Sequence, residues 1–502
     1  WPCMKVGVIG GGPAGLLAAR LLALDGHEVA LHERLPPDDT FGFGVGLTGG
    51  LLKTLEAADR PLHDAIVGAS FPFAGAAFRL PAGDVELSQF HTGAIGRAKL
   101  LRVLTEHAAA AGVDVRIGAA AAIDDLRSDH DLVIAADGVS SAARDQLAGT
   151  LGVADDEGRG LFIWCGAPVA LEGAVFVPVQ TPDGLFVAHA YPYGPEMSTF
   201  VIETDAAALD AAGCRQASFA ADADSDERAL AYLSDAFAEV LGGRAFVGNR
   251  SRWMHFRTIS CTRWHHENIV LLGDAKATAH PSMGSGTKLA LEDAVALAQT
   301  LRDGGDPAAF EAARRPAVET IQDRARRSQL WWESFGSRLH LSPARVAVAY
   351  LSRSGAVSLD QLAASAPELA SRAVAEWAGL DPARVPGDGL TEWVLDQPGR
   401  RADPSVNGTE APIIDIALED AWSPEGDALL GRVREYADRG ASYVLLAGDG
   451  SRLGLLDRLA FGERVRMEVG VPVAVISEPE QLGDVADGIV AGRIDLAVVN
   501  EG

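Results

Sequence analysis

The sequence feature that most restricts the fold lies near the start of the chain, where a glycine-rich segment joins two apolar runs. Residues 5–9 read Lys-Val-Gly-Val-Ile, residues 10–15 read Gly-Gly-Gly-Pro-Ala-Gly, and a leucine-rich run follows. This is the pattern G-x-G-x-x-G between a strand and a helix, which is typical of nucleotide-binding parallel sheets. Gly10 allows the tight turn, Gly12 allows a pyrophosphate to approach the backbone, and Gly15 allows the helix to pack on the strand.

Pro13 and Ala14 complete this predicted turn, and the next predicted strand, residues 28–32, is followed by Glu33 and Arg34. A carboxylate at the end of that strand is placed to accept a hydrogen bond from a ribose hydroxyl. We include Arg34 in the same predicted site. The pattern therefore predicts a bound dinucleotide, without distinguishing FAD from NAD.

A second glycine-rich segment follows an apolar strand in the second half of the chain. Residues 269–272 read Ile-Val-Leu-Leu and lead to Asp274, and a long amphipathic run begins near residue 284. The Asp274 carboxylate can accept from a ribityl hydroxyl. The glycines allow backbone N–H groups to approach a ligand at the positive end of a helix dipole. The predicted cofactor contacts in this segment are Gly273, Asp274, Gly284, Ser285, Gly286 and Thr287.

A third apolar strand, residues 131–136, ends in Asp137 and Gly138, which we also predict to contact the cofactor. Ser141 and Arg144 continue the pattern as D-G-x-x-S-x-x-R. Ser141 is as well suited to cap the following helix as to bind a ligand. Arg144 either pairs within the protein or reaches a cofactor or nicotinamide phosphate.

Two further segments between these motifs are candidates for the same site. Residues 41–50 hold many glycines, which suits a loop that lies flat against a planar ligand, although a flexible surface loop fits the composition equally well. Arg97 opens a predicted helix, where its charge opposes the helix dipole. We predict that Arg97 has an anionic partner, either a pyrophosphate or a flavin, and a surface salt bridge is the alternative.

The glycine turn with Glu33, the Asp137-Gly138 pair, and the Asp274 segment stand in this order along the chain. This combination resembles the single-component flavin aromatic hydroxylases, the para-hydroxybenzoate hydroxylase-like class A monooxygenases, over roughly residues 4–340. The resemblance implies that Glu33 holds the adenosine ribose of FAD, that Arg97 contacts FAD, and that Asp274 holds the ribityl chain. It also implies that the backbone of residues 284–287 faces the pyrimidine end of the isoalloxazine.

A finer resemblance rests on residues 188–193, 263–266 and 284–288, which look like the salicyloyl-CoA and anthraniloyl-CoA hydroxylase branch of this family. Two positions depart from the broader family pattern. Ala277 stands where that family usually has histidine, and Lys288 stands where it usually has asparagine, although the branch shares the lysine. We draw no catalytic consequence from Ala277.

The resemblance implies tightly bound FAD, NAD(P)H as a transient co-substrate, and O₂. The implied reaction is hydroxylation of a small aromatic or heteroaromatic ring, of the phenol or hydroxypyridine type, through a flavin hydroperoxide, and we expect a role in natural-product biosynthesis. An aryl-CoA hydroxylase of aromatic degradation is one alternative. Another FAD oxidoreductase and a non-catalytic FAD-binding protein are the others.

Residues 155–258 differ from the flanking sequence because they contain short β-type runs at 161–164, 174–179, 185–191 and 199–203. We expect an antiparallel sheet that forms one wall over the flavin. Alternation places Val187, His189 and Tyr191 on one face, where His189 and Tyr191 would orient or deprotonate an aromatic hydroxyl. A structural histidine and a packing tyrosine are the alternatives. The predicted substrate contacts are Phe43, Val45, His91, Val187, His189, Tyr191, Tyr193 and Pro281.

The tail has strands predicted at 443–447, 471–476 and 495–499, with helices at 452–468 and 479–491. It resembles the end of an old-yellow-enzyme barrel. Because a full barrel needs about 250 residues, we expect a truncated α/β tail without FMN. The predicted fold is α/β: a Rossmann-like FAD domain (4–154 and 259–340), an inserted antiparallel substrate domain (155–258), a helical linker (341–385) and a degenerate C-terminal domain (386–502).

Composition restricts the partners. The formal net charge of -26 argues against binding to nucleic acid or to an anionic membrane surface. The four cysteines are scattered, and the neighbouring His265 and His266 point apart along the chain, so we predict no metal site. No apolar run approaches the ~20 residues of a membrane span. We expect a cytoplasmic homo-oligomer.

Overall fold

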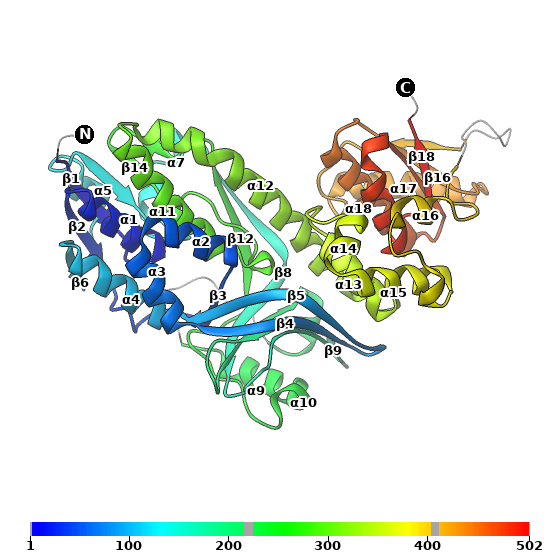
Figure 1. Cartoon of the computed structure of the whole chain (residues 1–502), viewed down its shortest axis with the longest axis horizontal. Helices are drawn as coiled ribbons and strands as arrows, with labels where there is room; N and C mark the ends of the chain where they lie inside the picture. Colours follow the sequence, from blue (N-terminus) through cyan, green and yellow to red (C-terminus); the bar gives the residue numbers. More distant parts are fainter. Residues whose placement is uncertain (1–2, 215–223, 403–410, 501–502) are drawn as a thin grey trace. The chain divides into compact units, whose positions relative to one another are not determined.

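The structure is a computed structural model that describes residues 3–214, 224–402 and 411–500, without the side chains of residues 88–92. The chain divides into two compact units (Figure 1). The first unit contains residues 1–77 and 90–329, and the second contains residues 78–89 and 330–502. Each unit is described separately.

A six-stranded sheet forms the nucleotide-binding half of the first unit, with the strand order β13-β14-β7-β1-β2-β6. The strands are β1 (Lys5–Ile9), β2 (Glu28–Glu33), β6 (Asp114–Ile117), β7 (Leu132–Ala135), β13 (His265–His266) and β14 (Ile269–Leu271). All neighbouring pairs are parallel except β13 with β14. The strands β7 and β14 are completely buried, which explains their continuous apolar sequence.

The helices that cover this sheet follow the glycine motifs. Helix α1 (Pro13–Leu24) packs against α4 (Arg97–Ala110) and α11 (Gly286–Arg302). Helices α2 (Gly49–Ala58) and α3 (Arg60–Ala69) pack against each other, and α2 also contacts α11. The predicted α/β class with a Rossmann-like sheet is therefore confirmed. The predicted helix starts at Arg97 and near residue 284 agree with α4 and α11 to within two residues.

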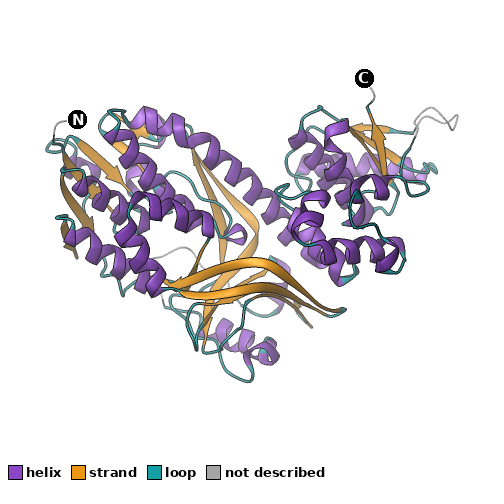
Figure 2. Cartoon of the chain, viewed as in Figure 1, coloured by secondary structure: helices purple, strands orange, loops and turns teal. Residues whose placement is uncertain are grey.

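The other sheet has eight strands in the order β12-β8-β11-β10-β9-β4-β5-β3 and belongs to the first unit except for residues 78–89 at the ends of β4 and β5. Strands are drawn in orange in Figure 2. The eight strands are β3 (Gly44–Leu47), β4 (Phe71–Leu80), β5 (Gly83–Gly96), β8 (Val153–Ala167), β9 (Ala174–Thr181), β10 (Gly184–Pro192), β11 (Ser198–Thr204) and β12 (Met254–Cys261). The four strands predicted within residues 155–258 correspond to β8–β11, and these pair antiparallel. The long β4 and β5 strands had no counterpart in the sequence analysis.

The eight-stranded sheet has two different faces. One face carries the apolar residues Ile163, Cys165, Phe186, Phe200 and Ile202, which form a core with α8 (Ala206–Ala211), α9 (Glu227–Ala236) and α10 (Ala238–Leu241). Because side chains alternate along a strand, the opposite face carries Trp164, Val187, His189, Tyr191, Thr199 and Glu203. We call this opposite face the inner face. It combines polar and aromatic side chains.

The second unit is built on a four-stranded parallel sheet in sequential order. Its strands are β15 (Ile413–Asp415), β16 (Val444–Ala447), β17 (Val473–Ser477) and β18 (Leu496–Val499). Its helices are α13 (Pro343–Ser352), α14 (Leu359–Ser365), α15 (Pro367–Ala378), α16 (Leu390–Leu395), α17 (Pro424–Asp438), α18 (Arg452–Glu468) and α19 (Leu482–Val490). The three strands and two helices predicted in the tail correspond to β16, β17, β18, α18 and α19.

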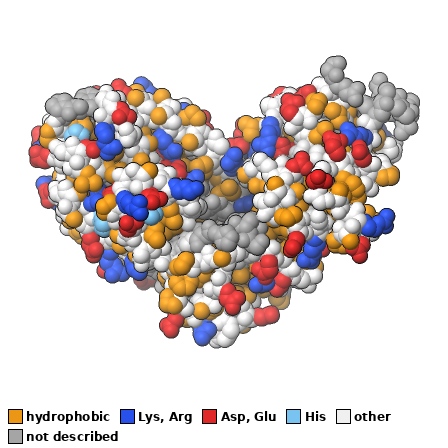
Figure 3. Space-filling model, in the orientation of Figure 1, with side chains coloured by type: hydrophobic (Ala, Val, Ile, Leu, Met, Phe, Trp, Pro, Cys, Tyr) orange, Lys and Arg blue, Asp and Glu red, His pale blue; other side chains and the backbone are white. Residues whose placement is uncertain are grey.

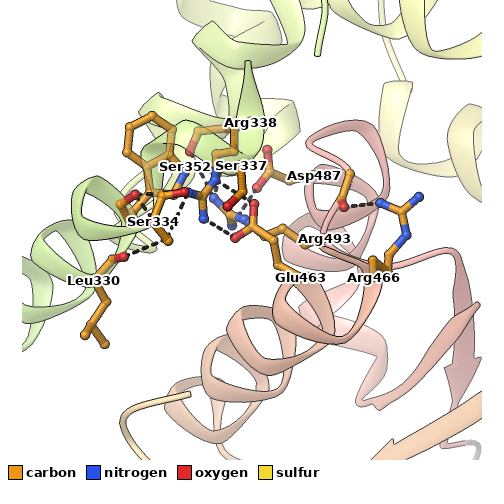
Figure 4. Close-up of polar contacts among 12 residues, drawn as sticks. Leu330, Ser334, Ser337, Arg338, Ser352, Glu463, Arg466, Asp487 and Arg493 are labelled. Atoms are coloured by element: carbon orange, nitrogen blue, oxygen red, sulfur yellow. Dashed lines mark hydrogen bonds and ion pairs between the residues drawn. The ribbon is translucent and has the colours of Figure 1, made fainter. Parts of the chain in front are cut away.

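A buried ionic network lies between the helices of the second unit (Figure 4). Arg338 Nε and Nη2 donate to the two carboxylate oxygens of Glu463 at 2.7 and 2.6 Å. Arg338 Nη1 also donates to the backbone carbonyls of Trp331 and Ser334 at 3.0 and 2.9 Å. Burial by itself raises the pKa of Glu463, but Arg338 outweighs it and holds that pKa below its usual value. This pair is therefore ionised inside the protein.

Asp487 is the weakly compensated member of the network. It lies 3.7 Å from Arg493 Nη1, whereas Arg493 Nη2 donates to Ala349 O at 3.0 Å and to Ser352 Oγ at 3.2 Å. Burial raises the pKa of Asp487 to about 7, Arg493 and Ser352 oppose the shift, and Asp484 and Glu463 add to it. The carboxyl group is therefore protonated at mildly acidic pH.

This network predicts a pH-dependent stability. Between pH 3.8 and about 7 the folded protein keeps a proton on Asp487 that the unfolded chain has lost, so the free energy of unfolding falls as the pH rises. The Asp487→Asn variant should lack this contribution, which amounts to about 1.4 kcal/mol per pH unit in that window. Urea unfolding followed at about pH 5 and about pH 7 measures the difference. Equal slopes for wild type and D487N would contradict the prediction, and the exposed Asp438→Asn is the control.

The surface contains both signs of charge. On the face drawn in Figure 3, acidic and basic side chains are interspersed. Within the described ranges, no helix has the length and apolar character that crossing a bilayer requires. Over the same residues, no three histidine, cysteine, aspartate or glutamate side chains are grouped as a metal site requires.

Candidate active site

The turn between β1 and α1 has the backbone geometry that the glycine motif predicts. Gly10 has φ +102°, and a Cβ there would lie 2.3 Å from Ala136 O. A Cβ on Gly15 would lie 2.1 Å from Gly10 O, so the strand and the helix touch at this point. A Cβ on Gly12, in contrast, would have no heavy atom within 4 Å. The space in front of Gly12 is open, as binding of a pyrophosphate requires.

The first turn of α1 also suits an anion. Gly12 occupies the N-cap position and provides no side-chain hydrogen bond, and Pro13 follows at the first helical position. The N–H groups of this turn therefore lack the side-chain cap that would otherwise satisfy them. They lie at the positive end of the helix dipole, so the turn fits the phosphates of FAD.

Glu33 lies directly beside this turn. Its Oε2 atom accepts a hydrogen bond from Gly11 N at 2.6 Å, and its Oε1 atom accepts one from Leu35 N at 2.8 Å. A carboxylate has further acceptor positions, so Glu33 retains capacity for a ribose hydroxyl. Arg34 is exposed.

The Asp137 carboxylate is used locally. Its Oδ1 atom accepts from the Ser141 hydroxyl at 2.5 Å, and its Oδ2 atom accepts from Ala143 N at 3.2 Å. Ser141 Oγ in turn accepts from Arg144 N at 3.0 Å, so Ser141 is a helix cap. The role of Asp137 and Gly138 as cofactor contacts stays a prediction, and Gly138 has φ +83° with open space at its Cβ position.

Arg144 pairs within the protein, the first of the two possibilities considered for it. It is buried, and its Nη1 atom donates to Ala275 O at 3.3 Å while Nη2 pairs with Asp145 at 3.1 Å. Ala275 belongs to the short helix η1 (Gly273–Ala275), which contains Asp274. The D-G-x-x-S-x-x-R segment therefore holds the Asp274 turn through the hydrogen bond from Arg144 to Ala275 O.

The Asp274 turn meets the first glycine turn. Gly273 has φ +61°, and a Cβ there would lie 3.0 Å from the Cβ of Ala14 at the start of α1. Asp274 itself is exposed. Partial desolvation by the surrounding protein raises the pKa of its carboxyl group, whereas Arg97 and Lys276 lower it. This is the environment of a carboxylate on the wall of a recessed site.

Arg97 reaches the same place from the N-terminus of α4. Its backbone N donates to Phe43 O at 2.7 Å, its Nε donates to Thr40 Oγ1 at 3.0 Å, and its guanidinium lies 4.7 Å from the ring centroid of Phe41. Burial lowers the pKa of Arg97, and the nearby Asp274 carboxylate opposes this shift. Asp274 is thus an anionic neighbour of Arg97 within the protein, and the predicted contact of Arg97 with a pyrophosphate or flavin stays a prediction.

The first turn of α11 is the third element of the site. It follows η2 (Pro281–Met283) and Gly284, which has φ +60°. Ser285 occupies the N-cap position without a side-chain capping bond, and its buried Oγ atom has no hydrogen-bond partner among the described residues. A Cβ on Gly284 or Gly286 would meet no atom within 4 Å. The N–H groups of this turn are available to an electron-rich ligand edge.

Two glycines of the 41–50 loop are required by aromatic rings of the protein itself, whereas a Cβ on Gly46, Gly49 or Gly50 would meet no heavy atom within 4 Å. A Cβ on Gly42 would lie 2.3 Å from the Trp164 ring, and one on Gly44 would lie 2.7 Å from Tyr193. Asn249 Nδ2 holds the loop by donating to the carbonyls of Thr40 and Gly42 at 2.9 and 2.8 Å. These contacts hold the start of the loop against the eight-stranded sheet, and its position against a planar ligand stays a prediction.

Tyr191 and His189 lie on the inner face, as the alternation predicts. The Tyr191 hydroxyl donates to Gly44 O at 3.0 Å, and its ring stacks on Phe73 with centroids 6.0 Å apart. Burial raises the pKa of Tyr191 well above its usual range. His189 Nε2 lies 3.4 Å from Glu203 Oε1, and both side chains are largely buried.

The remaining predicted substrate residues are distributed around this face. Val45 and Val187 are buried, while Phe43, Tyr193 and Pro281 are partly exposed. The side chain of His91 lies outside the described residues. The sequence analysis missed two residues of the inner face. Glu203 was missed because only the strand register brings it close to His189. Trp164 was also missed, and its Nε1 donates to Thr199 Oγ1 at 2.6 Å. An acidic residue inside an apolar strand was the signal available for Glu203.

Comparisons with known proteins agree with this geometry. A family model described as "FAD binding domain" matches residues 3–313. Salicyloyl-CoA 5-hydroxylase from Streptomyces sp is 35% identical over 98% of this chain and 99% of its own length. The 3-hydroxy-4-methyl-anthranilyl-[aryl-carrier protein] 5-monooxygenase from Streptosporangium sibiricum is 38% identical over 66% of this chain and 89% of its own.

The solved structures show a similar fold. A crystal structure of 2-methyl-3-hydroxypyridine-5-carboxylic acid oxygenase superposes with a TM-score of 0.55 at 20% identity, and the match covers 70% of this chain and 96% of the oxygenase. At this level of identity, the similarity concerns the fold.

Proposed function

Because the chain belongs to the FAD binding domain family, we propose that it is a single-component monooxygenase that hydroxylates an aromatic or heteroaromatic ring, with NAD(P)H as reductant and O₂ as oxygen source. The observation that carries the proposal is the meeting of three elements at one place: the open turn at Gly12, the exposed Asp274 carboxylate and the uncapped start of α11. The names of the two relatives support the reaction class.

The protein side of the site has a distinct task for each element. The backbone at Gly12 and the first turn of α1 hold the FAD pyrophosphate, Glu33 accepts from the adenosine ribose, and Asp274 accepts from the ribityl chain. FAD, when bound and reduced, supplies the activation of O₂. The helix dipole at residues 284–287 would stabilise negative charge on the ring system of bound FAD.

The inner face of the eight-stranded sheet holds and activates the substrate ring. Tyr191 stays protonated because burial raises its pKa, so its role is to orient the ring and the Gly44 backbone rather than to remove a proton. His189 is the residue that takes a proton from the ring hydroxyl and thereby increases the electron density of the ring. Glu203 orients the imidazole of His189.

The substrate is a small ring, either a free phenol or hydroxypyridine or an aryl thioester. The names of the two relatives favour the second possibility, because one acts on a CoA thioester and the other on a substrate attached to an aryl-carrier protein. Homo-oligomerisation, a cytoplasmic location and the lack of FMN stay predictions.

The experiment that tests this function measures NAD(P)H oxidation by the purified yellow protein with and without a ring substrate. Candidate phenols, hydroxypyridines and aryl-CoA thioesters are compared, and the products are identified by mass. Ring-stimulated oxidation that gives a product heavier by one oxygen atom is the expected result. Bound FAD whose reduction no ring accelerates would instead support a non-catalytic FAD-binding protein.

We predict a moderate effect for the Glu203→Gln variant. The Glu203 carboxylate lies 3.4 Å from His189 Nε2 and stabilises the imidazolium that forms when His189 takes the ring proton, so its loss should reduce kcat roughly tenfold, which corresponds to about 1.4 kcal/mol. FAD binding should stay unchanged, because Glu203 lies on the inner face and not at the glycine turns. Glu203→Asp should restore part of the rate. Stopped-flow measurement of product formation gives the rate of each variant. A wild-type rate in E203Q would show that Glu203 does not orient His189 for the reaction.

A further inference from the structure

Lys276 occupies an unusual position immediately after the Asp274 turn. Its side chain is 1% exposed, and so is that of its ionic partner Asp293 in the third turn of α11. A lysine is almost never buried to this degree unless it is paired. The mechanism proposed above does not use this residue.

The Lys276 ammonium group is held on two sides. Nζ lies 2.9 Å from Asp293 Oδ2 and 3.9 Å from the ring centroid of Trp264, the geometry of a cation–π contact. The other oxygen of Asp293 accepts from Arg314 Nε at 2.9 Å. Trp264 is itself fixed, because its backbone N donates to Glu311 Oε2 at 2.8 Å. The lysine therefore has one well-defined position.

This position links two elements of the candidate cofactor site. Lys276 follows η1, which contains Asp274, and Asp293 belongs to the helix that begins at Gly286. The Arg144 bond to Ala275 O supports the same turn from the opposite segment of the chain. Through the ion pair, a displacement of the turn is transmitted to α11, and the reverse also holds.

We infer that Lys276 is a positioning residue for FAD: its ion pair with Asp293 fixes the Asp274 turn relative to α11, so that both grip the cofactor together. The inference deepens the proposed function and rests on its cofactor, but not on the identity of the substrate. Breaking a buried pair on one side leaves an uncompensated charge, whereas removing both charges avoids that cost.

Lys276 also influences the charge of Asp274. Arg97 and Lys276 lower the pKa of the Asp274 carboxyl group, and Asp293 raises it. Removal of Lys276 takes away one of the two positive neighbours that lower the pKa of Asp274. Asp293, which raises that pKa, is then less strongly opposed. The pKa of the Asp274 carboxyl group should then be higher than in the wild type. As the pH is lowered, the variant should therefore lose the carboxylate that accepts from the ribityl chain at a higher pH than the wild type does.

The test measures FAD affinity of the full chain, by flavin fluorescence quenching, over a range of pH. Lys276→Met keeps the length of the side chain and removes its charge. We expect the FAD dissociation constant of K276M to rise at least about tenfold at neutral pH. We also expect the pH below which affinity falls to move upward. The Arg302→Met variant is the control, because Arg302 also pairs α11 with another helix, through Asp25 at the C-cap of α1 at 3.0 Å, but at the far end of α11.

The double variant K276M/D293N separates positioning from stability. It removes both charges of the pair, and Arg314 keeps Glu292 as an anionic partner at 3.4 Å. The melting temperature of its apoprotein should therefore return toward the wild-type value, while FAD affinity stays weak. Recovery of wild-type FAD affinity together with stability would overturn the inference, as would wild-type affinity in K276M. If the wild-type protein itself takes up no FAD, the proposed function fails instead, and the two failures are distinguished.

Discussion

The Gly12→Val variant is expected to fold like the wild type and to be purified without yellow colour. A Cβ at Gly12 would have no heavy atom of the protein within 4 Å, so the substitution does not disturb the packing of the turn. The valine side chain would instead fill the space that the pyrophosphate needs. We expect FAD affinity to fall at least about a hundredfold, which corresponds to a loss of about 2.7 kcal/mol.

The measurement compares FAD affinity with thermal unfolding of the apoprotein. Gly68→Val is the matched control, because Gly68 lies in α3 and its Cβ would also meet no atom within 4 Å. Gly15→Ala is the contrasting case. Its Cβ would lie 2.1 Å from Gly10 O, so this substitution should destabilise the fold itself. Yellow G12V protein with normal affinity would show that the pyrophosphate lies elsewhere.

The second large effect is expected for His189→Gln, which should lose activity by about 10²–10⁴-fold while retaining FAD. Glutamine keeps a polar group on the inner face next to Glu203 but cannot accept the ring proton at neutral pH. The loss should appear in kcat for substrates with an ionisable ring hydroxyl. A substrate that is added already ionised should recover part of the rate.

A second histidine of the same sheet provides the control. His255 lies on β12, and its Nδ1 atom is 3.0 Å from Gly160 O. We assign it no role in the reaction, so His255→Gln should retain kcat within about twofold. If H189Q retains the wild-type kcat with a hydroxylated ring as substrate, His189 is a structural residue and the proton leaves by another route.

Sequence alone was sufficient for those parts of the site that depend on local backbone chemistry. The glycine at residue 10 needs a positive φ, and the pattern around it specifies a strand, a turn and a helix within twenty residues. The helix start at Arg97 follows from the same local rules, and so does the helix cap that was one of the two possibilities for Ser141. These predictions need no knowledge of the rest of the chain.

The parts that were missed depend on distant partners. The β4 and β5 strands contain Gly75 and small residues, and tertiary pairing with other strands determines their extent. Glu203 meets His189 only through the antiparallel register of β10 and β11. The position of Lys276 could not be predicted, because nothing nearby in the sequence shows that Asp293 and Trp264 surround its ammonium group.

One feature of the six-stranded sheet bears on how the protein is made. The strand β14 lies beside β7, although residues 136–268, including most of the eight-stranded sheet, separate the two in the chain. During synthesis the ribosome must therefore release the segment beyond residue 286 before both halves of the FAD-binding surface exist. Flavin then binds late in synthesis, and until that point β7 in the nascent chain can pair with β1 but not with β14. Proteolytic cleavage between residues 136 and 268 would leave each fragment with only part of the FAD-binding surface. Flavin would then be retained only while the two fragments stay associated.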